Sequence, residues 1–369
     1  MKKLLFSHEK LKEISKDFGV NAIGAVEAKL LDSSLFKKWQ ELGGAADLEY
    51  LKRDASFFTN PFNLLEEARS IILFLFFYED SSYKLLDCPS GFGRVARFAY
   101  GKNYHKVIKK HLVNIANKIG EELRKENLEE DFKYRVFVDA VPISERVFAK
   151  EAGLGFLGNS SMLVNPDFGT YFFIGEIVTN LEITDVPKNE EFKHDCNICN
   201  SCQKACVNKV KEKGFFDVNR CTSYLTIEKK GIIKKDDWHL LGNWIFGCDF
   251  CQTSCPFNKK GKSVSKKLEL GTSVTENGLI NLKDLLEIND DDEFLKRYNG
   301  TSFMRAKREN IIRNSLIVIA NQFHDKMWKN GTKIENNYLL DIIKNIGDND
   351  KSEVIRYTAR EVFDYLKGI

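Results

Sequence analysis

Residues 196–206 read CNICNSCQKAC, and residues 248–256 read CDFCQTSCP. With one isolated cysteine between them, the two stretches hold eight of the nine cysteines of the chain: Cys196, Cys199, Cys202, Cys206, Cys221, Cys248, Cys251 and Cys255. The gaps of two, two and three residues in the first stretch are the spacing of bacterial ferredoxins. The second stretch repeats the end of that spacing but lacks one cysteine, which Cys221 can supply. The pattern therefore predicts two [4Fe–4S] clusters with four cysteine ligands each.

In ferredoxin spacing the last cysteine of a run binds the other cluster, and this crossover divides the ligands. The first cluster is expected to be held by Cys196, Cys199, Cys202 and Cys255. The second is expected to be held by Cys206, Cys221, Cys248 and Cys251. Zinc is the alternative, but it favours two separate Cys-x2-Cys pairs over a third cysteine at the same short interval. Val207 stands where such runs usually carry proline, which weakens the turn and leaves the ligand count intact.

Composition places the chain among globular proteins. Its 369 residues are 43% hydrophobic and 12% aromatic, so two or three domains are expected. The net charge of +3 means that any contact with nucleic acid must come from local basic patches. The longest apolar run, residues 71–78, is far shorter than the about 20 residues that span a bilayer, and we expect a cytoplasmic protein. Cys88, outside the clusters, is expected to be a small apolar filler.

An α+β architecture with three domains is expected. Residues 1–190 mix helix and strand signals and indicate an α/β sandwich around a central sheet. Its clearest signals are the buried-strand run SIILFLFFY (70–78), the amphipathic helix NYHKVIKKHLVNIANKIGEELRKE (103–126) and the strand GTYFFIGEIVTN (169–180). Residues 191–260 carry the cysteines and are expected to form a ferredoxin-like domain.

The third expected domain, residues 261–369, is helical. RENIIRNSLIVIANQF (308–323) and SEVIRYTAREVFDYLKG (352–368) are both amphipathic and hint at paired helices of the HEAT kind. Two copies are too few to prove a repeat.

Two neighbouring clusters carry electrons, and these electrons need an acceptor. The first 190 residues are therefore expected to hold a redox cofactor or a docking face for a redox partner. No Rossmann fingerprint is present, and the Gly-rich GLGFLGN (153–159) is expected to be a plain turn. Nor is there an Asp-x-His-x-x-Gly motif of the kind that places a histidine on cobalt.

Several stretches, taken together, resemble the epoxyqueuosine reductase family over nearly the whole chain. They are YGKNYHKVIKKH (100–111), VDAVPISERVFAKEAGLGFLGNSSMLV (138–164), RCTSYLTIEKKG (220–231), CDFCQTSCPFN (248–258) and RENIIRNSLIVIANQ (308–322). The cysteines alone indicate only a two-cluster protein, and the combination makes the resemblance specific.

The resemblance implies a cobalamin-dependent enzyme, related to reductive dehalogenases, that reduces epoxyqueuosine at the wobble position of tRNA to queuosine. It implies that the first domain holds cobalamin without a histidine ligand, that the clusters supply electrons, and that the HEAT-like helices help to hold tRNA. Removing an epoxide oxygen takes two electrons and two protons, so an acid must reach that oxygen. The family's donor is the aspartate of Asp-x-x-Pro-x-x-Glu-Arg, here Asp139, which the sequence alone would make a helix cap or turn residue. Glu145 and Arg146 of the same motif are expected to pair structurally.

Matched by motif, six residues are expected near the cofactor: Tyr100, His105, Ser160, Ser223, Asp249 and Phe250. Two stretches depart from the family. Where the family often reads Arg-Asp-Tyr-His, this chain has Lys-Asn-Tyr-His at 102–105, and where it often reads Gly-Lys-Asn-Thr, this chain has Gly-Asn-Ser-Ser at 158–161. The lost charges bear on contacts with the phosphate or tail of cobalamin.

Two basic stretches are candidates for tRNA phosphate contacts, with solvated surface as the alternative. Residues 256–267 hold five lysines and no acid: Lys259, Lys260, Lys262, Lys266 and Lys267. Residues 301–334 hold seven Lys and Arg against two acids. An external reductant and a monomer are expected. A reductase of a small organic substrate, as in the dehalogenases, and a two-cluster electron carrier remain open.

Overall fold

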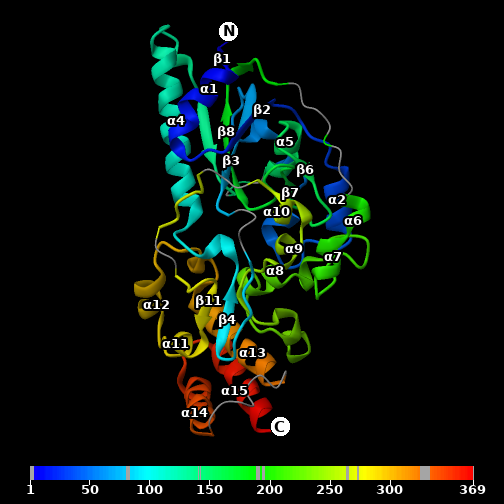
Figure 1. Ribbon diagram of the computed structural model, residues 1–369, viewed down its shortest axis with the longest axis vertical. Helices are drawn as coiled ribbons and strands as arrows, with labels where there is room; N and C mark the ends of the chain where they lie inside the picture. Colours follow the sequence, from blue (N-terminus) through cyan, green and yellow to red (C-terminus); the bar gives the residue numbers. More distant parts are fainter. Residues whose placement is uncertain are drawn as a thin grey trace.

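The computed structural model describes residues 4–79, 84–139, 141, 143–187, 192, 196–262, 266–271, 274–324 and 333–368. The described chain mixes helices and strands, in agreement with the predicted α+β class. The N-terminus lies at one end of the long axis and the C-terminal helices at the other (Figure 1). No helix in these ranges is both long and apolar enough to cross a membrane.

A four-stranded antiparallel sheet forms the N-terminal part. Its order is β2 (Ala22–Glu27), β3 (Ser70–Phe77), β8 (Phe172–Thr179) and β5 (Tyr134–Phe137). The two central strands are buried along their whole length, which explains their nearly unbroken apolar sequence. The predicted strands at 70–78 and 169–180 are therefore confirmed.

Helices cover both faces of this sheet because successive side chains of a strand point to opposite sides. One face packs on α1 (His8–Ser15) and α4 (Tyr104–Arg124), through residues such as Phe74 and Phe173. The other face packs on α5 (Glu145–Glu151), through residues such as Leu73 and Ile174. α4 confirms the predicted helix over residues 103–126 (Figure 1).

A second sheet joins segments that are far apart in the sequence. β4 (Phe92–Val95) pairs in parallel with β10 (Trp244–Phe246) and antiparallel with β11 (Leu279–Asn281). One apolar core follows from this pairing and runs from Val95 through Val218 to Leu366. The predicted domain division at 190 and 260 stays a prediction, and this core crosses both positions.

The cysteine-bearing segment consists of short helices that group beside the lower end of the first sheet (Figure 1). They are α6 (Cys196–Cys199), α7 (Ser201–Ala205), α8 (Thr222–Ile227), α9 (Phe250–Thr253) and α10 (Pro256–Lys260). α7 packs against α9, which brings the first cysteine stretch beside the second.

The C-terminal part is built mainly from helices: α11 (Leu282–Leu286), α12 (Asp291–Tyr298), α13 (Lys307–His324), α14 (Lys333–Asn349) and α15 (Glu353–Lys367). α15 packs on both α13 and α14. The helices predicted over 308–323 and 352–368 are confirmed as α13 and α15.

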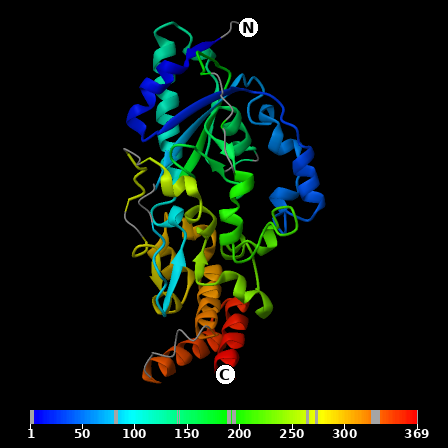
Figure 2. The same cartoon turned by 45° about the vertical axis from the view of Figure 1, so that its right-hand side comes forward.

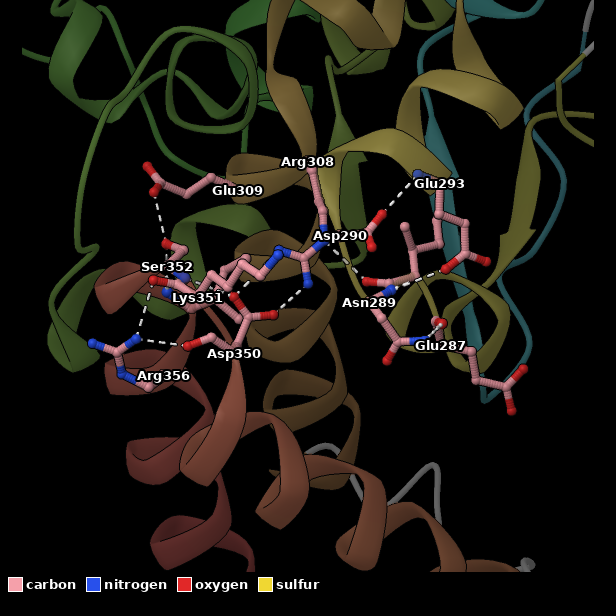
Figure 3. A network of polar contacts seen from close by, with 12 residues as sticks. Glu287, Asn289, Asp290, Glu293, Arg308, Glu309, Asp350, Lys351, Ser352 and Arg356 are labelled. Atoms are coloured by element: carbon pink, nitrogen blue, oxygen red, sulfur yellow. Dashed lines mark hydrogen bonds and ion pairs between the residues drawn. The ribbon is translucent and has the colours of Figure 1, made fainter.

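A buried ion pair ties these helices together (Figure 3). Both guanidinium Nη atoms of Arg308, at the start of α13, donate to the Asp350 carboxylate between α14 and α15, and both side chains are almost fully buried. Arg308 Nε also donates to the Ile288 carbonyl over 2.9 Å. Asp350 in turn accepts from the Ser352 amide, and the Ser352 hydroxyl donates to Glu309.

Candidate active site and cluster-binding site

Asp139 stands just beyond the end of β5, with a side chain that is 60% exposed. Its φ of 48° is left-handed, a conformation that few residues other than glycine adopt and that aspartate tolerates better than most. Its Oδ2 atom accepts a hydrogen bond of 2.8 Å from the Tyr104 hydroxyl and lies 3.8 Å from His105 Nε2. The carboxyl is thus held on one side and open on the other.

The first turn of α4 holds this carboxyl. Tyr104 is fixed because its ring stacks on Phe173 of β8, with centroids 4.0 Å apart and planes 7° apart. His105 is fixed by Asn103, the N-cap of the helix, whose Oδ1 accepts from the His105 amide and lies 2.8 Å from Nδ1. Nδ1 therefore carries a proton, and Nε2 is the atom turned to Asp139. Asn103, which stands where the family often has aspartate, is thus the residue that caps α4.

Two residues from distant segments, Tyr50 and Arg305, interact electrostatically with Asp139, and the sequence predicted neither of them. Tyr50, in η2 (Glu49–Lys52), is 45% exposed, and its pKa is raised chiefly by burial, with Glu228 and Asp139 adding and Arg305 opposing. Arg305 donates to both carboxylate oxygens of Glu228, over 2.7 and 3.0 Å. In Figure 2 the blue segment that carries Tyr50 arches along one side of the molecule.

Two further carboxyls lie on the buried side of Asp139. Glu176 of β8 is 1% exposed, and neither of its carboxyl oxygens meets a donor among the residues that the structure describes. Glu145, the first residue of α5, interacts with it through its own carboxyl. Arg146 acts on Glu145 electrostatically and also donates to the Ser161 carbonyl, so the predicted structural pairing of Glu145 with Arg146 stays a prediction.

Cys196, Cys199, Cys202 and Cys255 line one cavity of about 420 Å³. The segment after β6 (Phe156–Leu157) lines the same cavity, and the Asn159 amide donates to Cys196 Sγ over 3.1 Å. Asn159 Nδ2 donates to the Cys196 carbonyl over 2.8 Å, which fixes the two segments to each other. Ser160 also lies at this cavity, so this predicted cofactor residue stands beside the first cluster set.

The remaining four cysteines form a second group. The Cys251 thiol interacts electrostatically with Cys221 and Cys206, and the Cys248 thiol with Cys251 and Cys221. The Cys251 thiol also interacts with Cys202 of the cavity, so the two groups adjoin, and the division of the eight thiols between two clusters stays a prediction. Soft thiolate donors in sets of four fit [4Fe–4S] clusters, although the assignment of single ligands stays a prediction.

The other predicted cofactor residues do not converge on Asp139. Asp249 is fully buried, and its Oδ2 accepts from the Arg97 amide over 2.7 Å. Tyr100 is 9% exposed, with the Arg97 guanidinium 4.5 Å from its ring centroid. Ser223 is half-buried in α8, and Phe250 packs edge-on against Trp244. Of the six, only His105 touches the donor carboxyl.

The basic stretch at 256–267 is less available than its sequence indicates. Lys262 and Lys267 each pair with a carboxylate, although Lys259 and Lys266 are exposed. The side chain of Lys260 lies outside the described residues.

The prediction for 301–334 is wrong for two of its arginines. Arg308 is 4% exposed and Arg313 is 0% exposed, so both side chains are buried inside the protein and not available to phosphates. Arg313 donates to the carbonyls of Lys229, Gly231 and Leu225. Residues 325–332 of that stretch lie outside the described residues.

Two family models and several relatives match this chain. A model described as "Epoxyqueuosine reductase QueG, DUF1730" matches residues 59–140, and a model of a 4Fe-4S double cluster binding domain matches residues 195–258. The epoxyqueuosine reductase of Francisella cf. novicida (strain Fx1) is 32% identical, over 86% of this chain and 89% of the relative. The chain belongs to the epoxyqueuosine reductase family. The epoxyqueuosine reductase of Aliivibrio fischeri is 30% identical, over 85% of this chain and 82% of the relative.

Solved structures of epoxyqueuosine reductases extend the likeness to the fold. The crystal structure of a selenomethionine-labelled epoxyqueuosine reductase has a TM-score of 0.79 and 26% identity, covering 97% of this chain and 90% of that one. A second epoxyqueuosine reductase, solved with an epoxyqueuosine-modified tRNA-Tyr stem loop, has a TM-score of 0.78 and 27% identity, covering 97% and 89%. Membership confirms the predicted oxidoreductase class, and the double-cluster domain confirms two [4Fe–4S] clusters over zinc.

Proposed function

We propose that this protein reduces epoxyqueuosine in tRNA to queuosine, with Asp139 as the proton donor. The observation that carries the proposal is the Asp139 carboxyl, which is held by Tyr104 and open on its far side in a chain of this family. A relative of the same fold was solved with an epoxyqueuosine-modified stem loop, which supports tRNA as the substrate.

The proposed electron path runs from the two clusters to cobalamin. When bound, cobalamin supplies a reduced cobalt centre that delivers electrons to the epoxide carbon. The residues here fit such a group: Nε2 of His105 is turned to Asp139, in keeping with a cofactor held without a histidine ligand. The partly exposed ring of Tyr50 and the exposed carboxyl of Asp139 are proposed to contact the bound cobalamin.

Each predicted cofactor residue has a proposed task. Asp249 and Tyr100 hold Arg97 and so shape the wall of the site. Ser160 and Phe250 stand beside the cluster ligands, and Ser223 follows Cys221 by two residues, so all three are proposed to lie where electrons leave the clusters.

The chain's own residues handle the proton. Asp139 gives a proton to the epoxide oxygen because an unprotonated alkoxide is a poor leaving group. Tyr104 orients the carboxyl and stabilises the carboxylate that forms. Arg305 and Tyr50, on the open side, are proposed to meet the tRNA or the modified base, since a splayed base stacks on aromatic side chains.

The finer architecture and setting belong to the same proposal. We propose an α/β sandwich for the cofactor-binding part, a ferredoxin-like arrangement for the cysteine segment and HEAT-like pairing for the C-terminal helices. The proposed protein is a cytoplasmic monomer served by an external reductant.

The test is anaerobic purification, cluster reconstitution and addition of cobalamin, followed by an assay for queuosine in epoxyqueuosine-tRNA. About eight irons and one corrin per chain, with turnover, are expected. Eight irons without retained corrin or turnover would instead indicate an electron carrier.

A further inference from the structure

Glu176 is a carboxyl in an apolar setting. It lies in β8 opposite Leu73 on one side and Phe137 on the other. By strand alternation it shares a face with Ile174 and Val178, which belong to the apolar cluster under α5. It is 1% exposed, and no donor among the described residues meets either oxygen. An ionised carboxylate in such a place is costly by several kcal/mol, so the group is expected to hold a proton.

Its partner is a second acid. The Glu145 carboxyl lies near enough to that of Glu176 for the two groups to act on each other electrostatically. Two neighbouring buried carboxyls do not both ionise readily, so a proton on one of them is favoured. Burial, and then the charge of Asp139, raise the pKa of Glu145 to about 7. Burial, and then the charge of Glu145, raise the pKa of Glu176 well above its ordinary value. Both shifts favour a proton on this pair.

The pair adjoins the donor. Asp139 follows Phe137, the β5 residue paired with Glu176, by two positions. The Tyr104 hydroxyl, 2.8 Å from Asp139 Oδ2, also interacts with Glu145. Arg146 from α5 acts on Glu145, and Asp139 also interacts with His105 from α4, Tyr50 from η2 and Arg305 from η8 (Ser302–Arg305). Asp139 thus has acids behind it and open space in front.

The reaction needs more protons than Asp139 holds. Converting an epoxide to an alkene consumes two electrons and two protons, and both protons leave on the same oxygen as water. A single carboxyl can give only one proton before it is reloaded. Its open side is the side where the substrate must lie, so the second proton is best supplied from behind.

We propose that Glu176, which is buried, and Glu145, which is half-buried, form a proton reserve that reloads Asp139 within a single turnover. This rests on the proposed function, in which Asp139 is the donor. Asp139 gives its proton to the oxygen as the C–O bond breaks, takes a second proton from the pair and passes it to the same oxygen. The pair, one proton short, is refilled from solvent after product release, and the electrons come from the clusters throughout. The two glutamates act through Asp139 and do not touch the substrate.

A first test needs no turnover. Infrared difference spectra of the holoenzyme, taken from mildly acidic to mildly alkaline pH, report the carbonyl stretch of protonated carboxyls. The wild-type protein is expected to show a protonated carboxyl that titrates near neutrality, which Glu145→Gln and Glu176→Gln abolish. Glu151→Gln, on the same helix and paired with Lys29, is the matched control and should retain it. A wild-type spectrum without such a band would overturn the proposal.

A second test is single-turnover reduction of epoxyqueuosine-tRNA by pre-reduced enzyme over the same pH range. Each Gln variant is expected to slow product formation at least about tenfold and to change the pH profile, and Glu151→Gln to match wild type. If both Gln variants have the wild-type rate and pH profile while Asp139→Asn is inactive, the proton-reserve proposal is wrong and the proposed function is unaffected. A fully active Asp139→Asn would remove the donor role itself. Should one Gln variant not fold, the other carries the test.

Discussion

The hydroxyl of Tyr104 donates a hydrogen bond of 2.8 Å to Oδ2 of Asp139. Tyr104→Phe removes that bond and leaves the ring stacked on Phe173. Because hydrogen bonds to charged groups contribute about 1.5–3 kcal/mol, we expect kcat to fall about ten- to hundredfold with little change in KM. Steady-state kinetics on epoxyqueuosine-tRNA measure this. Tyr134→Phe, near the start of β5, is the control, and an unchanged kcat in Tyr104→Phe would contradict the role.

Asp139→Asn keeps the shape of the donor and removes its proton. We expect turnover to fall at least about a hundredfold, since a positioned acid contributes about 10²–10⁴-fold. Iron and corrin content should equal those of wild type, because Asp139 is no ligand of the clusters. Asp167→Asn, at a surface carboxylate paired with Lys262, is the control. Full turnover of Asp139→Asn would show that another group donates the proton.

The crossover assignment predicts which cluster each cysteine serves. Cys255→Ser should remove the cluster of the cavity that holds Cys196, and Cys221→Ser should remove the other. Each variant is expected to retain about four irons and to lose a different electron paramagnetic resonance signal. Cys88→Ser should retain all iron. Loss of the same signal in both variants would refute the division.

The buried Arg308–Asp350 pair is expected to govern the stability of the C-terminal helices. Asp350→Ala leaves the arginine charge buried, so we expect a loss of about 3–5 kcal/mol in the free energy of unfolding. Chemical denaturation followed by circular dichroism measures it. Lys12→Ala breaks the exposed pair with Glu9 and should cost less than about 1 kcal/mol. Equal losses in the two variants would show that the buried pair has no special weight.

Glu176 predicts a pH dependence of stability. Its pKa is raised in the folded state, chiefly by burial, so the folded protein binds this proton more tightly than the unfolded chain does. The stabilisation is complete below the unfolded pKa of about 4.3 and is lost as pH rises through the folded value. In acid, Glu176→Gln should have the melting temperature of wild type. As the pH rises, its melting temperature should increasingly exceed that of wild type. A difference in melting temperature that stays constant with pH would count against a proton on Glu176.

Local patterns carried much of the fold. The apolar runs at 70–78 and 169–180 became the two buried strands β3 and β8, because a strand covered on both faces needs no polar alternation. The helix α4 followed from its three-and-four apolar spacing. The prediction of a phosphate-binding surface at 301–334 was wrong for Arg308 and Arg313, because both side chains are buried. A sequence shows which residues are charged but not which of them are buried.

The sequence by itself determined the cluster chemistry, and its resemblance to the family gave Asp139 as the candidate proton donor. Cysteine spacing is a local property, and the motif around Asp139 is continuous, so both can be read along the chain. Only the tertiary structure decided what surrounds that donor. Tyr50, Arg305 and Glu176 come from segments far from residue 139, and chain folding alone brings them to it. The burial that raises the pKa of Glu176 arises from packing between a strand and a helix, which no local pattern records.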